Sequence, residues 1–316
     1  MPQPLTRRSC LQSLAGLGAL AISGFAGCGG ETASSSRGEW LATFGRHGIS
    51  PGRFTKPRGI AIDAEDRLYI VDMTARIQVF DRDFKYLRHW QTPTHELGRP
   101  TGLSVARDGS ILIADTHYYR VLVYSPEGEL LKTVGGTRGP GEGEFHFVTD
   151  IAEDSQGNYI ISEYGEWDRL HVYDHDWNFV RMWGGHGSAP GEFLRPQSIA
   201  VDKQDRIWVT DACNHRIQVF DRAGKHLEQW GEQGTALGQL AYPYAIYFDP
   251  EGNLEICEYG NNRVQKFTPA GKSLGAWGEP GQREKQLFNP WSSVRDSQGR
   301  TIIIDSLNHR VQVIRL

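Results

Sequence analysis

Short apolar runs alternate with turn residues along most of the chain, and the alternation recurs. Within residues 196–230, three apolar runs are separated by segments rich in Asp, Asn and Gly, and a fourth run ends at Trp230. Runs of this length bounded by turn residues indicate β-strands. Each copy has an acid-to-arginine core: Asp72 to Arg76, Asp115 to Arg120, Glu163 to Arg169, Asp211 to Arg216, Glu258 to Arg263 and Asp305 to Arg310.

The spacing of the six arginines identifies the architecture. Successive arginines are separated by 44, 49, 47, 47 and 47 residues, a period that is typical of four-stranded propeller blades rather than helical arrays. Repeats of this kind bury their faces against one another, so they form one unit. We therefore predict an all-β, six-bladed β-propeller of four-stranded blades that occupies residues 39–316 as a single domain.

The two ends of the repeat region are complementary. Residues 39–45 match the fourth strand of a repeat but lack the first three, whereas the last repeat supplies three strands and ends at Leu316. An open array would leave two unpaired strand edges, which natural proteins avoid. The N-terminal strand is therefore expected to complete the last blade and close the ring.

Residues 1–27 have the features of an export signal. Arg7 and Arg8 precede an uncharged run that is rich in Gly and Ala, and small residues lie immediately before Cys28. This segment resembles a Tat signal peptide with a lipoprotein cleavage site, although Phe25 replaces the usual aliphatic residue. We expect lipidation of Cys28, a flexible tether over residues 28–38, and an exported, periplasmic or cell-surface protein held by its lipid anchor. The alternative is an ordinary signal peptide with a chance cysteine.

Composition limits the classes of partner. The mean hydropathy of −0.48 and the 37 glycines suit a soluble all-β protein and exclude a multi-span membrane protein. The formal charge is −4, and loss of the arginine-bearing leader makes the mature chain more acidic. That sign is unsuitable for a phosphate-binding surface, so we expect no nucleic-acid partner.

The repeat core resembles the NHL repeat, most clearly at Asn214-His215-Arg216 and Asn308-His309-Arg310. The resemblance covers residues 39–316 and implies a propeller. NHL propellers serve as protein- or RNA-binding platforms, as extracellular sensor modules and, in one branch, as a zinc-dependent lyase acting on peptidyl-hydroxyglycine. The resemblance therefore leaves the function open.

The acid-to-arginine pairs allow two interpretations. Strand order places the turns between the second and third strands of each blade on the same face as the connectors between blades, so twelve charges gather there. They could form a ligand site. Because the pair occurs in every blade, we favour salt bridges that each pin a hairpin.

Residues that depart from the repeat are the better candidates for a site. The first strands open with Arg58, Thr101, Thr149, Gln197, Tyr244 and Trp291 around the channel mouth. The predicted ligand-binding residues are Arg58, His117, Tyr118, Asp150, Glu163, Tyr164, Trp167, Tyr244, Glu258, Tyr259 and Trp291. A concave aromatic surface with carboxylates suits a protein, peptide, saccharide or cationic small ligand. Alternatively, the aromatic rings only fill the channel mouth.

A zinc-dependent enzyme would require histidines placed to bind the metal. A zinc site needs about three converging imidazoles, and His117, His146, His215 and His309 are all expected on the motif-bearing face. His215 and His309 occupy the histidine position of the Asn-His-Arg motif, where packing roles are common. The zinc ligands of the lyase branch have no residue-by-residue match in this sequence. We therefore predict a non-catalytic binding protein without a cofactor, with a zinc-dependent lyase as the alternative. For Cys213 and Cys257 we favour thiols over a disulfide.

Overall fold

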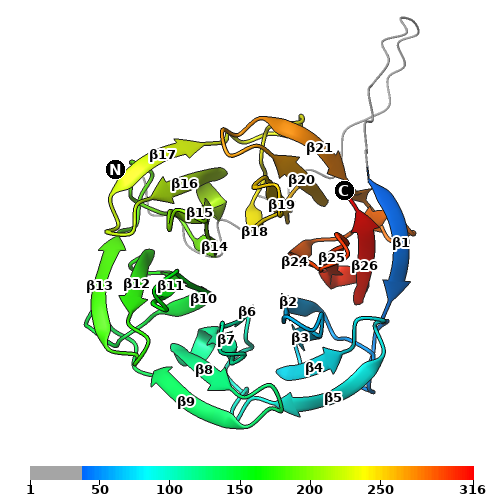
Figure 1. Cartoon of the computed structure of the whole chain (residues 1–316), viewed down its shortest axis with the longest axis horizontal. Coiled ribbons are helices and arrows are strands. Elements are labelled where there is room, and N and C mark those ends of the chain that lie inside the picture. The colour runs from blue at the N-terminus through cyan, green and yellow to red at the C-terminus, as the bar shows by residue number, and fades with distance from the viewer. Residues whose placement is uncertain (1–37) are drawn as a thin grey trace, which may run out of the picture.

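The alternating runs form six four-stranded antiparallel sheets around a common central axis, which we call the channel axis (Figure 1). The computed structural model describes residues 38–316; the predicted signal peptide and Cys28 lie outside this range. From the channel outward, blade 1 contains β2 (Pro57–Ile62), β3 (Leu68–Asp72), β4 (Arg76–Phe80) and β5 (Tyr86–Gln91), and blade 2 contains β6 (Gly102–Val105), β7 (Ile111–Asp115), β8 (Arg120–Tyr124) and β9 (Leu130–Gly135). Blade 3 contains β10 (Phe147–Glu153), β11 (Tyr159–Tyr164), β12 (Arg169–Tyr173) and β13 (Phe179–Gly184).

Blades 4 to 6 continue the same order. Blade 4 contains β14 (Pro196–Val201), β15 (Ile207–Asp211), β16 (Arg216–Phe220) and β17 (His226–Trp230), and blade 5 contains β18 (Pro243–Phe248), β19 (Leu254–Glu258), β20 (Arg263–Phe267) and β21 (Ser273–Trp277). Blade 6 contains β24 (Pro290–Arg295), β25 (Thr301–Asp305), β26 (Arg310–Arg315) and β1 (Glu39–Phe44). Short 3-10 turns η1 (Thr116–Tyr118), η2 (Ala212–Asn214) and η3 (Ser306–Asn308) join second to third strands, and the pair β22 (Glu279–Pro280) and β23 (Gln286–Leu287) lies in the last connector.

The predicted fold and its closure are confirmed. β1 pairs antiparallel with β26, from Glu39 opposite Arg315 to Phe44 opposite Val311. The blue and red ends of the chain therefore share one blade in Figure 1. Because the backbone groups of β26 are paired by β1, blade 6 has the same four-stranded width as the others, and the ring has no unpaired seam.

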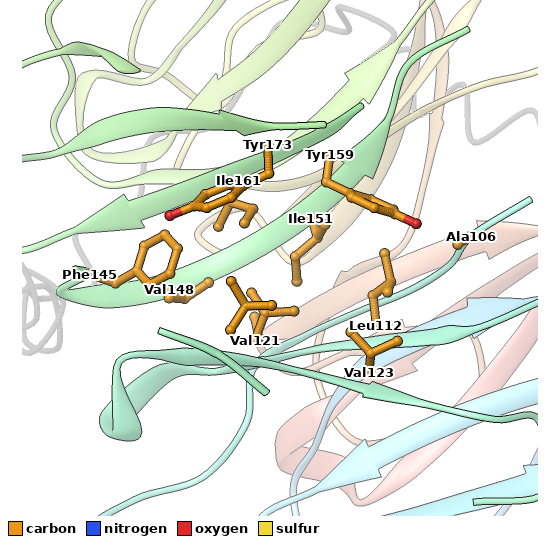
Figure 2. Packing of buried hydrophobic residues seen from close by; sticks show 12 residues of the cluster. Ala106, Leu112, Val121, Val123, Phe145, Val148, Ile151, Tyr159, Ile161 and Tyr173 are labelled. Carbon is orange, nitrogen blue, oxygen red and sulfur yellow. The ribbon is translucent and has the colours of Figure 1, made fainter. Parts of the chain in front are cut away.

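The cores lie between neighbouring blades. Figure 2 shows Val121 of blade 2 facing Val148 and Ile151 of blade 3, with Ile161 of β11 behind them. All four side chains are fully buried, and burial of one such side chain contributes roughly 1.5–3 kcal/mol. β-branched residues suit this surface because their stiff side chains stand perpendicular to a pleated sheet. Each blade is thus stabilised mainly by its two neighbours.

Five of the six connectors in residues 38–316 end in a fully buried apolar residue: Phe54, Phe145, Phe193, Leu240 and Leu287. Each forms a short parallel bridge back to the start of its connector. Gly45 shows why glycine precedes this loop, since it has a φ of +80° and a Cβ there would overlap the Phe54 ring. Residues 92–99, between blades 1 and 2, contain no such bridge.

We call the face that carries the connectors and the turns between second and third strands the upper face. Backbone N–H groups of connector residues Thr55 and Leu194 donate to Asp72 and Asp211, which end second strands, and this places both loop types together. The opposite, lower face carries the remaining turns. In the described range, no helix has the length and apolar character needed to cross a bilayer.

Candidate functional site

All six acid-to-arginine pairs form. The nitrogen-to-oxygen distances are 3.5 Å for Arg76 and Asp72, 2.7 Å for Arg120 and Asp115, 2.5 Å for Arg169 and Glu163, 2.8 Å for Arg216 and Asp211, 2.6 Å for Arg263 and Glu258, and 2.7 Å for Arg310 and Asp305. Every acid in this set has an exposed fraction of 0%. The twelve charges are therefore beneath the upper face and not a surface cluster.

Each pair also holds the connector above it. In blade 4, Asp211 accepts a hydrogen bond from the backbone N–H of Leu194 at 2.8 Å, while Arg216 donates to the carbonyl oxygens of Ser188, Ala189 and Glu192. Gln218 donates to both the Glu192 carbonyl and Asp211. Burial raises the pKa of Asp211 to about 6, although Asn214, Leu194 and Arg216 all favour its ionised form. This network is architectural, and it explains why the pair occurs in each blade.

Blade 2 departs from this pattern. Its connector is short, Leu122 replaces the glutamine, and within residues 38–316 no connector N–H donates to Asp115. Asp115 retains its bond to Arg120, but its Oδ1 is buried without a hydrogen-bond partner among the described residues. Burial raises the pKa of Asp115, and the Arg120 interaction only partly offsets that rise. The shorter connector therefore leaves a less extensive version of the same network, in which Arg120 binds Asp115 and Thr94.

The residue before each blade arginine has a left-handed backbone and, in four blades, fixes the next blade. The φ values are 60° at Ala75, 55° at Tyr119, 39° at Asp168, 55° at His215, 55° at Asn262 and 56° at His309. Backbone N–H groups one blade onward donate to the side chains of Asp168, His215, Asn262 and His309, from Arg195, Tyr242, Asn289 and Lys56 respectively. His215 and His309 thus have an inter-blade role that asparagine and aspartate also perform.

The four histidines considered for zinc lie on four different blades. His117 belongs to η1 and lies beside Phe147, with ring centres 5.3 Å apart and the rings tilted at 56°. The Nδ1 atoms of His146, His215 and His309 each accept a backbone hydrogen bond. Among residues 38–316, no group of three His, Cys, Asp or Glu side chains has the arrangement needed to hold a metal ion.

A pocket opens at the upper mouth of the channel. We call it the mouth pocket; its volume is about 220 Å³ and its lining is Lys56, Arg58, Arg195, Tyr244, Tyr259, Asn289, Trp291, Ser306 and Leu307. Four of these, Arg58, Tyr244, Tyr259 and Trp291, are among the predicted binding residues. They come from blades 1, 5 and 6, which converge on the channel in Figure 1.

The walls of the mouth pocket are an ordered stack of rings and guanidinium groups. Tyr244 and Tyr259 stack with ring centres 4.6 Å apart, and Trp291 lies edge-on to Tyr244 at 5.1 Å. Arg58 lies 4.7 Å from the Trp291 ring centre, and Arg195 lies 5.1 Å from that of Tyr244. Cation–π contacts of this kind fix the planes of both arginines. The rings and guanidinium groups of the pocket therefore already contact one another without a ligand.

Burial controls the tyrosine hydroxyls of the mouth pocket. Desolvation raises the pKa of Tyr244 and of Tyr259, while the nearby Arg195 opposes both shifts. Both hydroxyls consequently stay protonated at neutral pH and can donate hydrogen bonds. The pocket combines neutral donors, cationic donors and apolar ring faces.

The remaining predicted residues do not join this pocket. Glu163 and Glu258 are fully buried in their blade networks. Asp150 lies in the channel wall, where it accepts hydrogen bonds from Ser198 Oγ and the Ile199 backbone; burial raises its pKa to about 6. Tyr118 bonds to Glu96 over blade 2, and Trp167 packs on Arg169 of blade 3. Tyr164 lies beside the pocket, 4.8 Å from the Arg195 guanidinium.

Sequence reasoning missed Lys56, Arg195 and Asn289. Each immediately precedes the proline that opens a first strand, and each has a positive φ, of 48°, 63° and 49°. The predicted residues Arg58, Tyr244 and Trp291 each follow such a proline. The residue before the proline also faces the mouth. In an alignment of the repeats, these three residues therefore stand one position before the proline and two positions before the residue that follows it.

A larger hollow lies on the lower face. Its volume is about 550 Å³, and Asp202, Arg206, Asp249, Arg295 and Asp296 are among its lining residues. Five of its charged lining residues form ion pairs within the fold: Asp202 with Arg206, Asp249 with Lys266, Arg295 with Glu255 and Asp296 with Arg300. We therefore regard this hollow as a by-product of the ion pairs that fasten the lower turns.

Known proteins support the repeat assignment. Residues 193–220, which run from the connector through β16, match the NHL repeat. The chain carries an NHL repeat in blade 4. Blade 4 is also where the complete network of aspartate, arginine and glutamine is found, so the matched residues are those that hold the connector.

Curated relatives share about half of this chain. Over 173 residues it is 31% identical to peptidylglycine alpha-amidating monooxygenase of Rattus norvegicus, which covers 51% of this chain and 16% of that protein. Over 175 residues it is 29% identical to NHL repeat-containing protein 3 of Homo sapiens, covering 50% of each. The chain thus spans half or less of the length of these relatives.

Solved structures agree on the fold. A streptogramin B lyase structure has a TM-score of 0.64 at 15% identity and covers 90% of this chain and 100% of that one. A putative gluconolactonase structure has a TM-score of 0.63 at 14% identity, covering 88% and 93%. At such identities the likeness concerns the propeller fold alone.

Proposed function

We propose that this propeller is a non-catalytic binding protein that takes a peptide, protein or saccharide ligand at the mouth pocket. The supporting observation is the stack of Tyr244, Tyr259 and Trp291 at the channel entrance. Aromatic rings with polar tips are effective binding surfaces because they bury large areas with little loss of side-chain freedom. The acid-to-arginine pairs, which would otherwise be candidates for chemistry, are used by the fold.

A binding screen tests this proposal. The mature chain is titrated with sets of peptides, oligosaccharides and small organic acids, and thermal stabilisation identifies those that bind. Trp291→Ala and Tyr244→Ala should weaken each hit at least tenfold, with folding retained by circular dichroism. Trp167→Ala is the matched control, since Trp167 lies on the same face but outside the pocket. Equal binding by the Trp291 and Trp167 variants would reject the mouth pocket as the site.

The metal content of the protein tests the proposal that it is not a zinc-dependent enzyme. Treatment with a chelator should leave binding unchanged, and elemental analysis of the purified protein should find no stoichiometric zinc. One tightly held zinc per chain, lost in a His146→Ala variant, would overturn the proposal in favour of a metal-dependent enzyme.

Export and anchoring are part of the same proposal. The twin arginines and Cys28 suggest a mature chain that begins with a lipidated cysteine and displays the propeller outside the cytoplasmic membrane. Mass spectrometry of the membrane fraction should find a diacylglyceryl-modified N-terminal Cys28. A water-soluble product with an unmodified N-terminus would reject the lipid anchor while leaving the binding proposal intact.

A further inference from the structure

The charge of the mouth pocket narrows the ligand. Lys56, Arg58 and Arg195 supply three cationic side chains, and none of the nine lining residues is acidic. The whole chain has a formal charge of −4, so this local excess of positive charge opposes the overall balance. Positive groups gathered in a concave, low-dielectric site concentrate anions from solution.

Two carboxylates near the mouth pocket are paired within their own blades. Glu258 and Asp305, which end the second strands of blades 5 and 6, have exposed fractions of 0%. Each is bound by the arginine of its own blade, Arg263 at 2.6 Å and Arg310 at 2.7 Å. These two acids are therefore matched below the pocket, and the lining itself carries Lys56, Arg58 and Arg195 without an acidic side chain.

The two arginines are positioned in advance. Arg195 lies between Tyr164 and Tyr244, 4.8 Å and 5.1 Å from their ring centres, and its Nε donates to Gln197 Oε1 at 3.0 Å. Arg58 is held over Trp291. A planar guanidinium with a fixed orientation presents paired N–H donors to an oxyanion with little further loss of entropy.

Ring faces and size define the rest of the ligand. Trp291 and Tyr259 lie 5.6 Å apart at 90°, which leaves apolar surface at the side of the cationic groups. A volume of about 220 Å³ is below the range of about 300–1,000 Å³ found for drug-sized ligands. The occupant is therefore a small molecule or the end of a larger one.

We propose that the mouth pocket recognises an organic anion, in which a carboxylate or phosphate-type group joined to a planar or apolar body binds Arg58 and Arg195. This proposal rests on the binding function proposed above and replaces the cationic class of small ligand with an anionic one. It assigns Lys56, Arg58 and Arg195 as specificity-determining residues.

Four probes test the charge requirement by calorimetric titration of the full mature chain. Phenylacetate carries the anion and the ring, phenylacetamide is its neutral isostere, acetate lacks the ring, and benzylphosphonate replaces the carboxylate. We expect phenylacetate or benzylphosphonate to bind at least tenfold more tightly than phenylacetamide and acetate. The stronger of the two anions identifies the head group.

Variants separate this inference from the proposed function. Arg195→Gln and Arg58→Gln should each weaken the anionic probe at least tenfold, whereas Arg138→Gln, an exposed upper-face arginine paired with Glu166, should not. Equal affinity for phenylacetate and phenylacetamide, or no binding of either anion at millimolar concentration, would overturn the inference. If neutral peptides or saccharides still bind in a Trp291-dependent manner, the binding function stands although the anion preference is rejected. If neutral peptides and saccharides also fail to bind, the binding function and the anion preference are both rejected.

Discussion

The Nδ1 atom of His309 accepts a hydrogen bond from the backbone N–H of Lys56 at 3.0 Å, across 253 residues of sequence. The bond joins blade 6 to blade 1, at the seam that β1 closes by pairing with β26. Its equivalent between blades 5 and 6 uses Asn262 Oδ1 and the N–H of Asn289 at 2.7 Å. The slot therefore accommodates more than one type of side-chain acceptor.

Substitutions at His309 test this role. His309→Ala should lower the free energy of unfolding by about 1 kcal/mol, the usual contribution of one hydrogen bond. His309→Asn should cost less, because asparagine supplies an acceptor and adopts the left-handed backbone readily, as Asn262 does. Urea unfolding measures both values. Equal losses for the two variants would show that the imidazole acts through packing rather than through Nδ1.

The same bond predicts a pH dependence. Burial lowers the pKa of His215 and of His309 below the ordinary value of 6.5; His47 and Lys56 lower that of His309 further, and Asp72 opposes the shift. The two histidines then bind protons more readily in the unfolded chain than in the folded chain. Their contribution to the free energy of unfolding is therefore fully present above pH 6.5 and is lost as the pH falls through their lowered folded-state pKa values.

Other groups titrate in the same range, so the comparison must be between variants. The pKa of Asp211 is raised to about 6, which changes stability in the opposite direction as the pH falls. The double variant His215→Asn, His309→Asn should lose less thermal midpoint between pH 7.5 and 5.5 than the unsubstituted protein. An identical loss in both proteins would contradict a role for these two imidazoles.

Ring closure predicts a large effect from a small deletion. Removal of residues 39–45 exposes the edge of β26 and should cost more than about 4 kcal/mol and promote aggregation. Glu39→Gln is the control, since it breaks only the exposed contact with Arg315 and should cost less than about 1 kcal/mol. Thermal unfolding and light scattering measure both effects; a monomeric deletion variant of unchanged stability would refute closure by β1.

Much of the fold was predictable because it repeats. The period, the six pairs and the complementary ends determine the number of blades and the closing strand, since a slipped register would misplace every blade arginine. The site was less predictable because a pocket is made of residues that differ between blades. Arg195 reaches Tyr244 from the preceding blade's connector, a contact that depends on ring curvature, and the burial of Glu163 and Glu258 depends on connectors whose path the strand pattern does not specify.

Because the hydrogen-bond network of blade 2 is less extensive than that of blade 4, the same substitution should lower the free energy of unfolding by different amounts in the two blades. Asp211→Asn removes the charge that accepts hydrogen bonds from Leu194, Asn214, Arg216 and Gln218. It should lower the free energy of unfolding by about 3–5 kcal/mol. Asp115→Asn affects one bond, to Arg120, and should cost about 1–2 kcal/mol. Chemical denaturation of the two variants provides the comparison. A larger loss at Asp115 than at Asp211 would contradict the assigned role of the connector.

Hydrogen–deuterium exchange of the mature chain, with and without saturating phenylacetate, tests the central claim that ligands enter at the mouth pocket. We expect slowed exchange in residues 55–58, 194–197, 257–261 and 288–291, which carry six of the nine lining residues, and none in the lower-face turns around residues 202–206 and 249–252. Trp291→Ala should abolish that protection. Protection of the lower turns with an unchanged upper face would contradict the account.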